Sequence, residues 1–94
     1  MIEWTDPAIQ QLNQSYDYIA LTNSEAVASH VIEHILASVQ RLATFPLSGR
    51  RGRIPDTREL VVSDTPFIVA YTIEDSRVVI LAMYHSARQW PETF

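Results

Sequence analysis

The residues best suited to chemistry stand together near the C-terminus, where a run of β-forming residues ends in Tyr84, His85 and Arg88. Cleaving RNA through its 2′-hydroxyl needs a base that titrates near neutral pH, an acid for the leaving oxygen and a cation on the phosphorane. His85, Tyr84 and Arg88 carry side chains suited to these three roles. The pattern has no second positioned base, so we assign no catalytic residue and keep a nuclease as an alternative hypothesis.

The same stretch also has an interpretation without catalysis. Trp90-Pro91 is suited to anchor the C-terminal tail, and His85 continues the alternation of the strand before it. Polar and aromatic groups at the end of a strand commonly form recognition sites. His85, Arg88 and Trp90 are therefore candidate contacts for a protein partner.

A second cluster is Gly49-Arg50-Arg51-Gly52-Arg53, which holds three arginines and both glycines of the chain. Arginine makes planar, bidentate contacts with carboxylates and phosphates, and the glycines predict a mobile, accessible loop. The loop either grips an acidic partner surface or phosphates, or is a solvated segment that offsets the acids of residues 1–40. Arg58 falls within the next predicted strand and is expected to pair with an acid.

His30, Glu33 and His34 match H-x-x-E-H, a zinc-protease pattern in which helical spacing puts two histidines on one side. At 100° per residue these side chains lie away from Val31 and Ile35, on the predicted solvent side. A third ligand would have to come from beneath the opposite face. We therefore expect no metal site.

A sheet is needed to position both clusters. Three runs of β-branched, aromatic and aliphatic residues, separated by turn residues at 63–66 and 74–76, predict an antiparallel meander. The runs cover residues 57–62 and 66–73 and a third stretch that starts at Val78.

Two amphipathic helices are expected before the sheet, after a short strand at residues 1–4. Asp6 is the predicted N-cap of the first helix, with Pro7 at its first position. Thr22 and Glu25 match a capping box that opens the second helix, which runs to about Thr44. The predicted buried stripes are Ile9, Leu12, Tyr16 and Ile19 in the first helix, and Val27, Val31, Ile35, Val39 and Leu42 in the second, widened by Ile32 and Leu36.

The helices form a hairpin that must lay its apolar stripe on the sheet. The predicted class is α+β, a two-layer β-α-α-β-β-β fold with the hairpin on one face of a mainly antiparallel sheet. We expect residues 1–94 to be one domain, with the other sheet face left for solvent or a partner.

The formal charge of −4 argues against a general polyanion binder, and the absence of cysteine excludes thiolate chemistry and disulfides. Residues 1–40 hold five acids and no lysine or arginine, whereas residues 41–60 hold five arginines. The N-terminus lacks a signal-peptide pattern, and no apolar run approaches the roughly 20 residues of a membrane span. We expect a cytoplasmic protein without membrane contact, cofactor or direct sequence-specific binding to nucleic acid.

The chain resembles the RelE/ParE superfamily of type II toxins, and its ParE branch in particular. The similarity covers the opening strand and helical hairpin, and then four motifs in order: Gly49-Arg50-Arg51-Gly52-Arg53, Thr57-Arg58-Glu59-Leu60-Val61-Val62, Pro66-Phe67-Ile68-Val69-Ala70-Tyr71 and His85-Ser86-Ala87-Arg88-Gln89-Trp90-Pro91. The resemblance implies that residues 1–94 form a RelE/ParE-like toxin domain. It also implies a cognate antitoxin that wraps the toxin, and a role in plasmid stabilisation or addiction.

The two branches differ in chemistry. RelE-like ribosome-dependent nucleases place an arginine on the middle strand, where this chain has Ile68, and basic residues on the strand before it, where this chain has Glu59 and Val61. ParE-like members lack the nuclease set and act on DNA gyrase. The sequence departs from the usual pattern in three positions, because Asp56 replaces a glycine, and Ala82 and Tyr84 replace an arginine and a leucine of the last strand.

Three hypotheses follow: a gyrase-directed toxin, which we favour, a ribosome-dependent mRNA endonuclease, and an inactive member that only binds protein. The antitoxin is expected to add a helix or strand that folds on contact and crosses the hairpin and the open sheet face. The candidate partner-binding residues are Arg50, Arg51, Arg53, Arg58, His85, Arg88 and Trp90.

Overall fold

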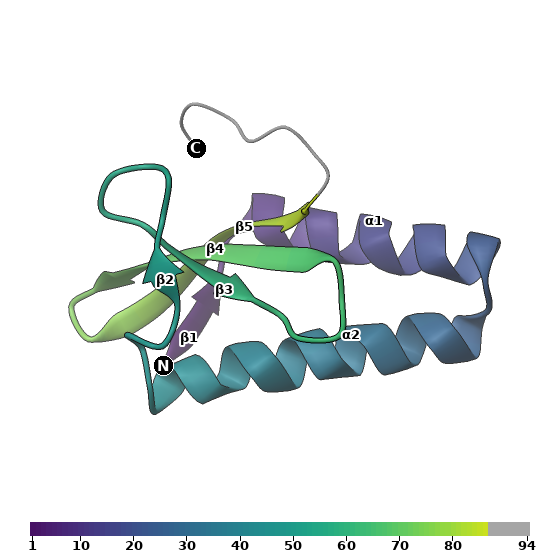
Figure 1. The fold of residues 1–94 in the computed structure, drawn as a ribbon, viewed down its shortest axis with the longest axis horizontal. Helices are drawn as coiled ribbons and strands as arrows, with labels where there is room; N and C mark the ends of the chain where they lie inside the picture. The colour runs from purple at the N-terminus through teal and green to yellow at the C-terminus, as the bar shows by residue number, and fades with distance from the viewer. Residues whose placement is uncertain (87–94) are drawn as a thin grey trace.

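The computed structural model describes residues 1–86, which form two helices packed against a five-stranded sheet (Figure 1). This confirms the predicted α+β class. Neither helix in this range has the length and apolar character that crossing a membrane requires. The predicted contacts Arg88 and Trp90 lie outside the described residues. The elements are β1 (Ile2–Trp4), α1 (Asp6–Thr22), α2 (Glu25–Gln40), the 3-10 turn η1 (Arg41–Ala43), β2 (Arg50–Arg51), β3 (Arg58–Val61), β4 (Phe67–Glu74) and β5 (Arg77–His85).

The strand order in the sheet is β1-β5-β4-β3-β2. β1 runs parallel to β5, and every other neighbouring pair is antiparallel. Thr5, which follows β1, holds that strand against β5, because its backbone N–H and its hydroxyl both donate to the Ile80 carbonyl, at 3.1 and 2.8 Å. These two residues are 75 positions apart, so the first edge of the sheet depends on the last strand of the described range.

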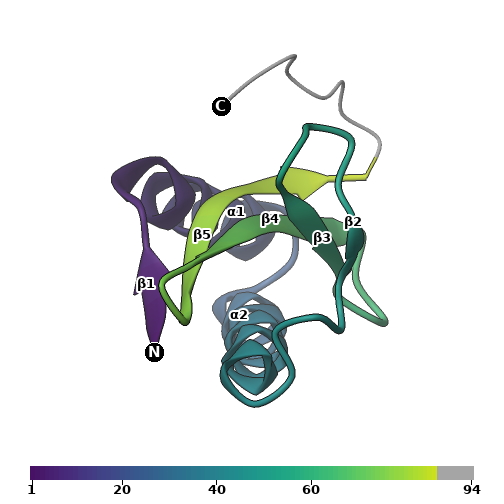
Figure 2. The same ribbon diagram turned by 90° about the vertical axis from the view of Figure 1, so that its left-hand side faces the viewer.

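The core lies between α2 and the sheet face that carries Phe67, Val69 and Tyr71 of β4. Alternate residues of a strand point to the same face, which puts these three side chains together. Ile35 and Val39 of α2 meet them and are 0% and 1% exposed. The second helix is therefore phased as its apolar stripe predicted. In Figure 2, α2 lies beneath the curved sheet.

The stripe of α1 is only partly as predicted. Ile9 is 42% exposed, whereas its neighbour Ala8 is fully buried in the core. Leu12 and Ile19 are partly buried and pack against the core, and Tyr16 is partly buried. The small side chain at position 8 lets the first turn lie close to the sheet, so that Ile9 turns outward.

Both predicted helix caps were wrong by one or two residues. Thr5 caps α1, since its hydroxyl oxygen accepts from the Ala8 N–H at 3.4 Å, and Asp6 is the first helical residue. Ser24 caps α2 by accepting from the Val27 N–H at 3.1 Å, which leaves no capping box. Thr22 still belongs to α1, where its hydroxyl donates to the Tyr18 carbonyl.

The exposed side of α2 also differs in detail from the prediction. His30 is exposed as expected, but His34 is partly buried, and its Nε2 lies 2.7 Å from the Ser63 carbonyl oxygen. Val27 and Leu36, which were assigned to the buried stripe, are 44% and 41% exposed. Neither histidine enters the core, so the predicted rotation of the helix holds. No group of three or more potential metal ligands occurs among residues 1–86.

The second sheet face is not left open as expected. Glu59, Ala70 and Ala82 are opposite one another across β3, β4 and β5 and are all buried, with exposures of 3%, 0% and 2%. Ile68 on the same face is 5% exposed. The loop between β2 and β3 rises on the side of the sheet away from α2 (Figure 2). A partner therefore meets a face that the chain already covers in part.

Replacing Ile35 by Asp tests the phasing of α2. The variant loses roughly 1.5–3 kcal/mol of apolar burial and places an unpaired carboxylate in the core. We expect it to lose the cooperative unfolding transition seen by circular dichroism. Leu36→Asp, on the exposed side of the same turn, is the control and should keep that transition. A folded Ile35→Asp protein with the thermal midpoint of the wild type would contradict this packing.

Candidate functional site

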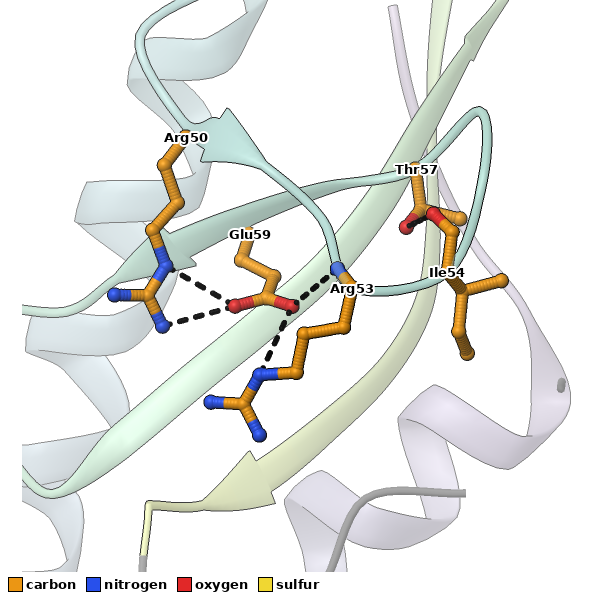
Figure 3. A network of polar contacts seen from close by, with 5 residues as sticks. All are labelled: Arg50, Arg53, Ile54, Thr57 and Glu59. Atoms are coloured by element: carbon orange, nitrogen blue, oxygen red, sulfur yellow. Dashed lines mark hydrogen bonds and ion pairs between the residues drawn. The ribbon is translucent and has the colours of Figure 1, made fainter. Parts of the chain in front are cut away.

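The candidate site is built on a buried carboxylate, Glu59 of β3. Its Oε1 accepts from Nε and Nη2 of Arg50, at 3.1 and 2.9 Å. Its Oε2 accepts from the backbone N–H of Arg53 at 3.0 Å and lies 3.6 Å from the Nε of the same residue (Figure 3). Because a buried charge is costly unless it is paired, these donors are what allow Glu59 to be 3% exposed.

The segment that was predicted to be a mobile arginine loop is therefore fixed. Arg50–Arg51 forms the short strand β2, which pairs with β3 and makes the edge of the sheet. The turn that follows is closed by Gly52, whose N–H donates to the Thr57 carbonyl at 2.7 Å. The Thr57 hydroxyl donates to the Ile54 carbonyl at 2.6 Å (Figure 3).

Both glycines are required by close contacts. A Cβ on Gly49 would lie 2.7 Å from Cε1 of Tyr71 and 2.9 Å from the Glu59 carbonyl oxygen. A Cβ on Gly52 would lie 2.8 Å from the Thr57 carbonyl oxygen. These distances are shorter than the contacts that a Cβ tolerates. The glycines that suggested mobility instead let the arginine segment pack tightly on its neighbours.

Asp56, which departs from the usual glycine of the family pattern, has a φ of 65°. That left-handed conformation suits glycine and is tolerated by aspartate better than by most residues. The Asp56 carbonyl accepts from the Thr72 hydroxyl at 3.0 Å, which ties the turn to β4. The substitution therefore preserves the backbone geometry that a glycine would supply.

Arg58 pairs with no acid of residues 1–86, contrary to the prediction. Its Nη1 donates to the carbonyls of Gly49, at 2.8 Å, and Leu47, at 3.4 Å. Tyr71 holds the same segment from the core, because its hydroxyl donates to the Pro46 carbonyl at 2.6 Å and accepts from the Gly49 N–H at 3.0 Å. Burial raises the pKa of the Tyr71 hydroxyl, against the opposing effects of the Gly49 hydrogen bond and the charge of Arg58.

These contacts shape an open groove with a volume of about 850 Å³, which we call the arginine groove. Among the described residues, its lining carries three guanidinium groups and one carboxylate. The lining residues are Arg51, Gly52, Arg53, Pro55, Asp56, Thr57, Arg58, Thr72 and Ile73.

A second, smaller hollow of about 370 Å³ lies at the end of β5, beside His85. The imidazole packs edge-on against Phe67, with ring centroids 5.8 Å apart and an interplanar angle of 81°. Burial raises the pKa of the neighbouring Tyr84, and a hydrogen bond from Gln11 opposes that effect. No arginine of residues 1–86 lines this hollow, whose lining is Gln11, Gln14, Ser15, Tyr18, Phe67, Met83 and His85.

The two sites lie at opposite ends of β4. His85 is paired with Phe67, the first residue of the strand, whereas Thr72 and Ile73 near its end line the arginine groove. Five or six residues of strand span roughly 17–20 Å. None of the three arginines that line the groove lines the hollow beside His85. Arg88, the predicted cation of the nuclease hypothesis, lies outside the described residues.

Sequence reasoning placed the arginines but missed the residue that organises them. Glu59 was noted only as an acid in a strand, and β2 was not predicted. The usable signal was the alternation of side chains along the strand. Leu60 lies on the core side, so its neighbour Glu59 points to the opposite face, beside the arginine segment.

Comparison with solved structures identifies the class to which the fold belongs. The chain superposes on a structure of the chromosomal ParDE toxin–antitoxin system from P. aeruginosa with a TM-score of 0.83, over 89% of this chain and 92% of that one. At 22% identity this match shows the shared fold alone. The chain therefore shares its fold with that protein.

Sequence comparison is more specific. Residues 2–90 match the family model described as "ParE toxin of type II toxin-antitoxin system, parDE". The chain is also 42% identical over 91 residues to the "Putative toxin Y4kP" of Sinorhizobium fredii, covering 97% of this chain and 93% of that protein. It therefore belongs to the ParE family of toxins, which agrees with the resemblance seen in its motifs.

The unequal roles of Arg50 and Arg51 can be tested by stability. Arg50→Ala removes two hydrogen bonds to a buried carboxylate and should cost about 2 kcal/mol of unfolding free energy in urea. Arg51→Ala should change it by less than about 0.5 kcal/mol, because that side chain makes no hydrogen bond or ion pair with another residue of the range 1–86. Adding Glu59→Leu to Arg50→Ala should recover part of the loss. Equal losses for the two single variants would contradict the arrangement.

Tyr71→Phe tests the link between the core and the arginine segment. The variant leaves the Gly49 N–H and the Pro46 carbonyl without their partner, at a cost of about 1–3 kcal/mol. Because the folded pKa of Tyr71 is raised above 10.0, the stability it contributes is complete below pH 10 and is lost as pH rises through the folded value. Urea unfolding above pH 10 should therefore weaken less steeply in the variant than in the wild type. An unchanged slope would show that Tyr71 does not titrate from this buried state.

Proposed function

We propose that this ParE-family protein stops growth by binding DNA gyrase as a protein poison, with no RNA-cleaving step, and that a cognate antitoxin neutralises it. The whole of residues 1–94 would act as one toxin domain in the cytoplasm, within a system that stabilises a plasmid or other replicon. Membership of the ParE family supports this, because the ParE branch of the superfamily acts on gyrase. The type II class supports the antitoxin partner.

One structural observation carries the choice against a nuclease. General acid–base cleavage needs a base, an acid and a phosphate-binding cation within hydrogen-bond reach of one substrate atom group. Among residues 1–86, His85 lies in a hollow with no arginine, while the arginine groove lies at the other end of β4. The raised pKa of Tyr84 also takes that hydroxyl further from the range useful to a general acid near neutral pH.

The charge distribution supports a protein target. The chain has a formal charge of −4, and residues 1–40 contribute five acids and no lysine or arginine. RNA binding rests on many phosphate contacts from basic residues. A protein target needs only a few well-placed arginine and aromatic groups, which suits the small number of cations that this chain offers.

His85→Gln is the variant that separates the two mechanisms. Glutamine keeps a polar side chain but cannot act as an acid or base near pH 7. We expect the variant to retain most of the toxicity, and the purified wild type to inhibit gyrase supercoiling. For a nuclease, losing the phosphorane-stabilising cation Arg88 would cost on the order of 10²–10³ in rate.

Induction in cells that carry an SOS reporter, with transcript ends mapped in parallel, reads both mechanisms at once. Gyrase poisoning should induce the reporter and leave transcripts intact. Ile35→Asp, which is expected not to fold, provides a control without toxin. Transcripts that are cut by the wild type and spared by His85→Gln would reject the gyrase proposal and favour the endonuclease.

A further inference from the structure

The cations of the arginine groove are not equivalent. Arg50, which is next to the lining residue Arg51 in the sequence, and Arg53, which is a lining residue, pair with the buried carboxylate of Glu59. Arg58 donates to the backbone carbonyls of Gly49 and Leu47. The Arg51 side chain is exposed and makes no hydrogen bond or ion pair with another described residue. The capacity of the groove to bind an added anion therefore resides mainly in Arg51.

The chemistry around Arg51 suits a carboxylate carried on a polypeptide. Arginine takes carboxylates through a planar fork, as Arg50 does with Glu59, where two nitrogens contact one oxygen at 2.9 and 3.1 Å. Ile73, which is 38% exposed, and Pro55 add apolar surface to the lining, and Thr72 adds a polar group. A volume of about 850 Å³ accommodates a few residues of extended chain. Asp56 in the lining disfavours a ligand as highly charged as a polyphosphate.

The distribution of charge over the rest of the molecule also favours binding of an acidic segment at the arginine groove. Five acids and no lysine or arginine occur in residues 1–40, which form β1, α1 and α2. The arginines of residues 41–60 are concentrated on and around β2 and β3. Acidic side chains are therefore repelled by the helical hairpin and attracted to the groove. Antitoxin segments that fold on binding are expected to be rich in charged residues, and the sign that fits here is negative.

We propose that the arginine groove binds an extended, acidic segment of the cognate antitoxin, with the Arg51 guanidinium as its main carboxylate ligand. This inference rests on the antitoxin partner of the proposed function and not on the gyrase target. Glu59 is a positioning residue in this site: its carboxylate holds Arg50 and Arg53 and so fixes the strand from which Arg51 projects. The antitoxin contacts Arg51, whereas Arg50 and Arg53 are paired with Glu59 of the toxin itself.

The test compares antitoxin binding by the full-length toxin and by Arg51→Ala, with Arg41→Ala as a control of equal charge from outside the groove lining. The dissociation constant of the purified cognate antitoxin is measured at low and at high salt. We expect Arg51→Ala to weaken binding roughly tenfold at low salt and less at high salt, where the ion pair is screened. Arg51→Lys keeps the charge without the fork and should fall between wild type and alanine. Arg41→Ala should bind within about twofold of wild type.

Hydrogen exchange locates the contact independently of affinity. Antitoxin should slow exchange of backbone amides in residues 51–58 of the wild type, and this protection should shrink in Arg51→Ala. Equal weakening by Arg51→Ala and Arg41→Ala would overturn the proposal by showing a general charge effect. Unchanged affinity of Arg51→Ala, or protection confined to the helical hairpin, would overturn it as well.

Gyrase supercoiling by the toxin alone is measured on the same variants, so that the two proposals fail separately. If Arg51→Ala loses gyrase inhibition and keeps its antitoxin affinity, the groove belongs to the target and the present inference is wrong. If the wild type never inhibits gyrase, the proposed function fails, and the antitoxin affinities still decide the inference.

Discussion

The buried carboxylate of Glu59 is the constraint on which the site depends. A charge at 3% exposure needs donors on both oxygens, and the chain supplies them from Arg50 and Arg53. The hydrogen bonds to this carboxylate hold the arginine-rich segment as the edge strand β2 followed by a closed turn. The surface groove therefore forms because the buried carboxylate needs hydrogen-bond donors. The same hydrogen bonds hold the groove on strand β3 and fix its shape.

The same requirement separates structural cations from available ones. Arginines that look alike in the sequence divide into those directed at Glu59, one directed at backbone carbonyls, and Arg51, which faces solvent. A count of basic residues would overstate the binding capacity of the loop. The membership of the ParE family says what kind of protein this is, and the hydrogen bonds say which side chains can still meet a partner.

Periodicity predicted the elements well and their ends poorly. The stripe through Ile35 and Val39 gave the phase of α2 because helical spacing survives small errors, and the alternation of the three long strands gave the meander. The caps at Thr5 and Ser24 were missed because several neighbouring residues have suitable side chains, and tertiary contacts choose among them. Strand β2 was missed because it has only two residues, both arginines, and its Arg50 is held by a tertiary contact, the ion pair with Glu59 opposite it.

The parallel pairing of β1 with β5 affects the order in which the toxin folds during translation. The residues of β1 pair with residues 76 positions later in the chain, so this edge of the sheet cannot form until β5 has been made. Contacts of such long range are slow to form because chain closure precedes any gain from pairing. During translation, the nascent chain therefore offers a helical hairpin well before it offers a complete sheet. The complete sheet of the toxin forms only after β5 has been translated. An antitoxin that is already present therefore has time to bind the toxin as it folds.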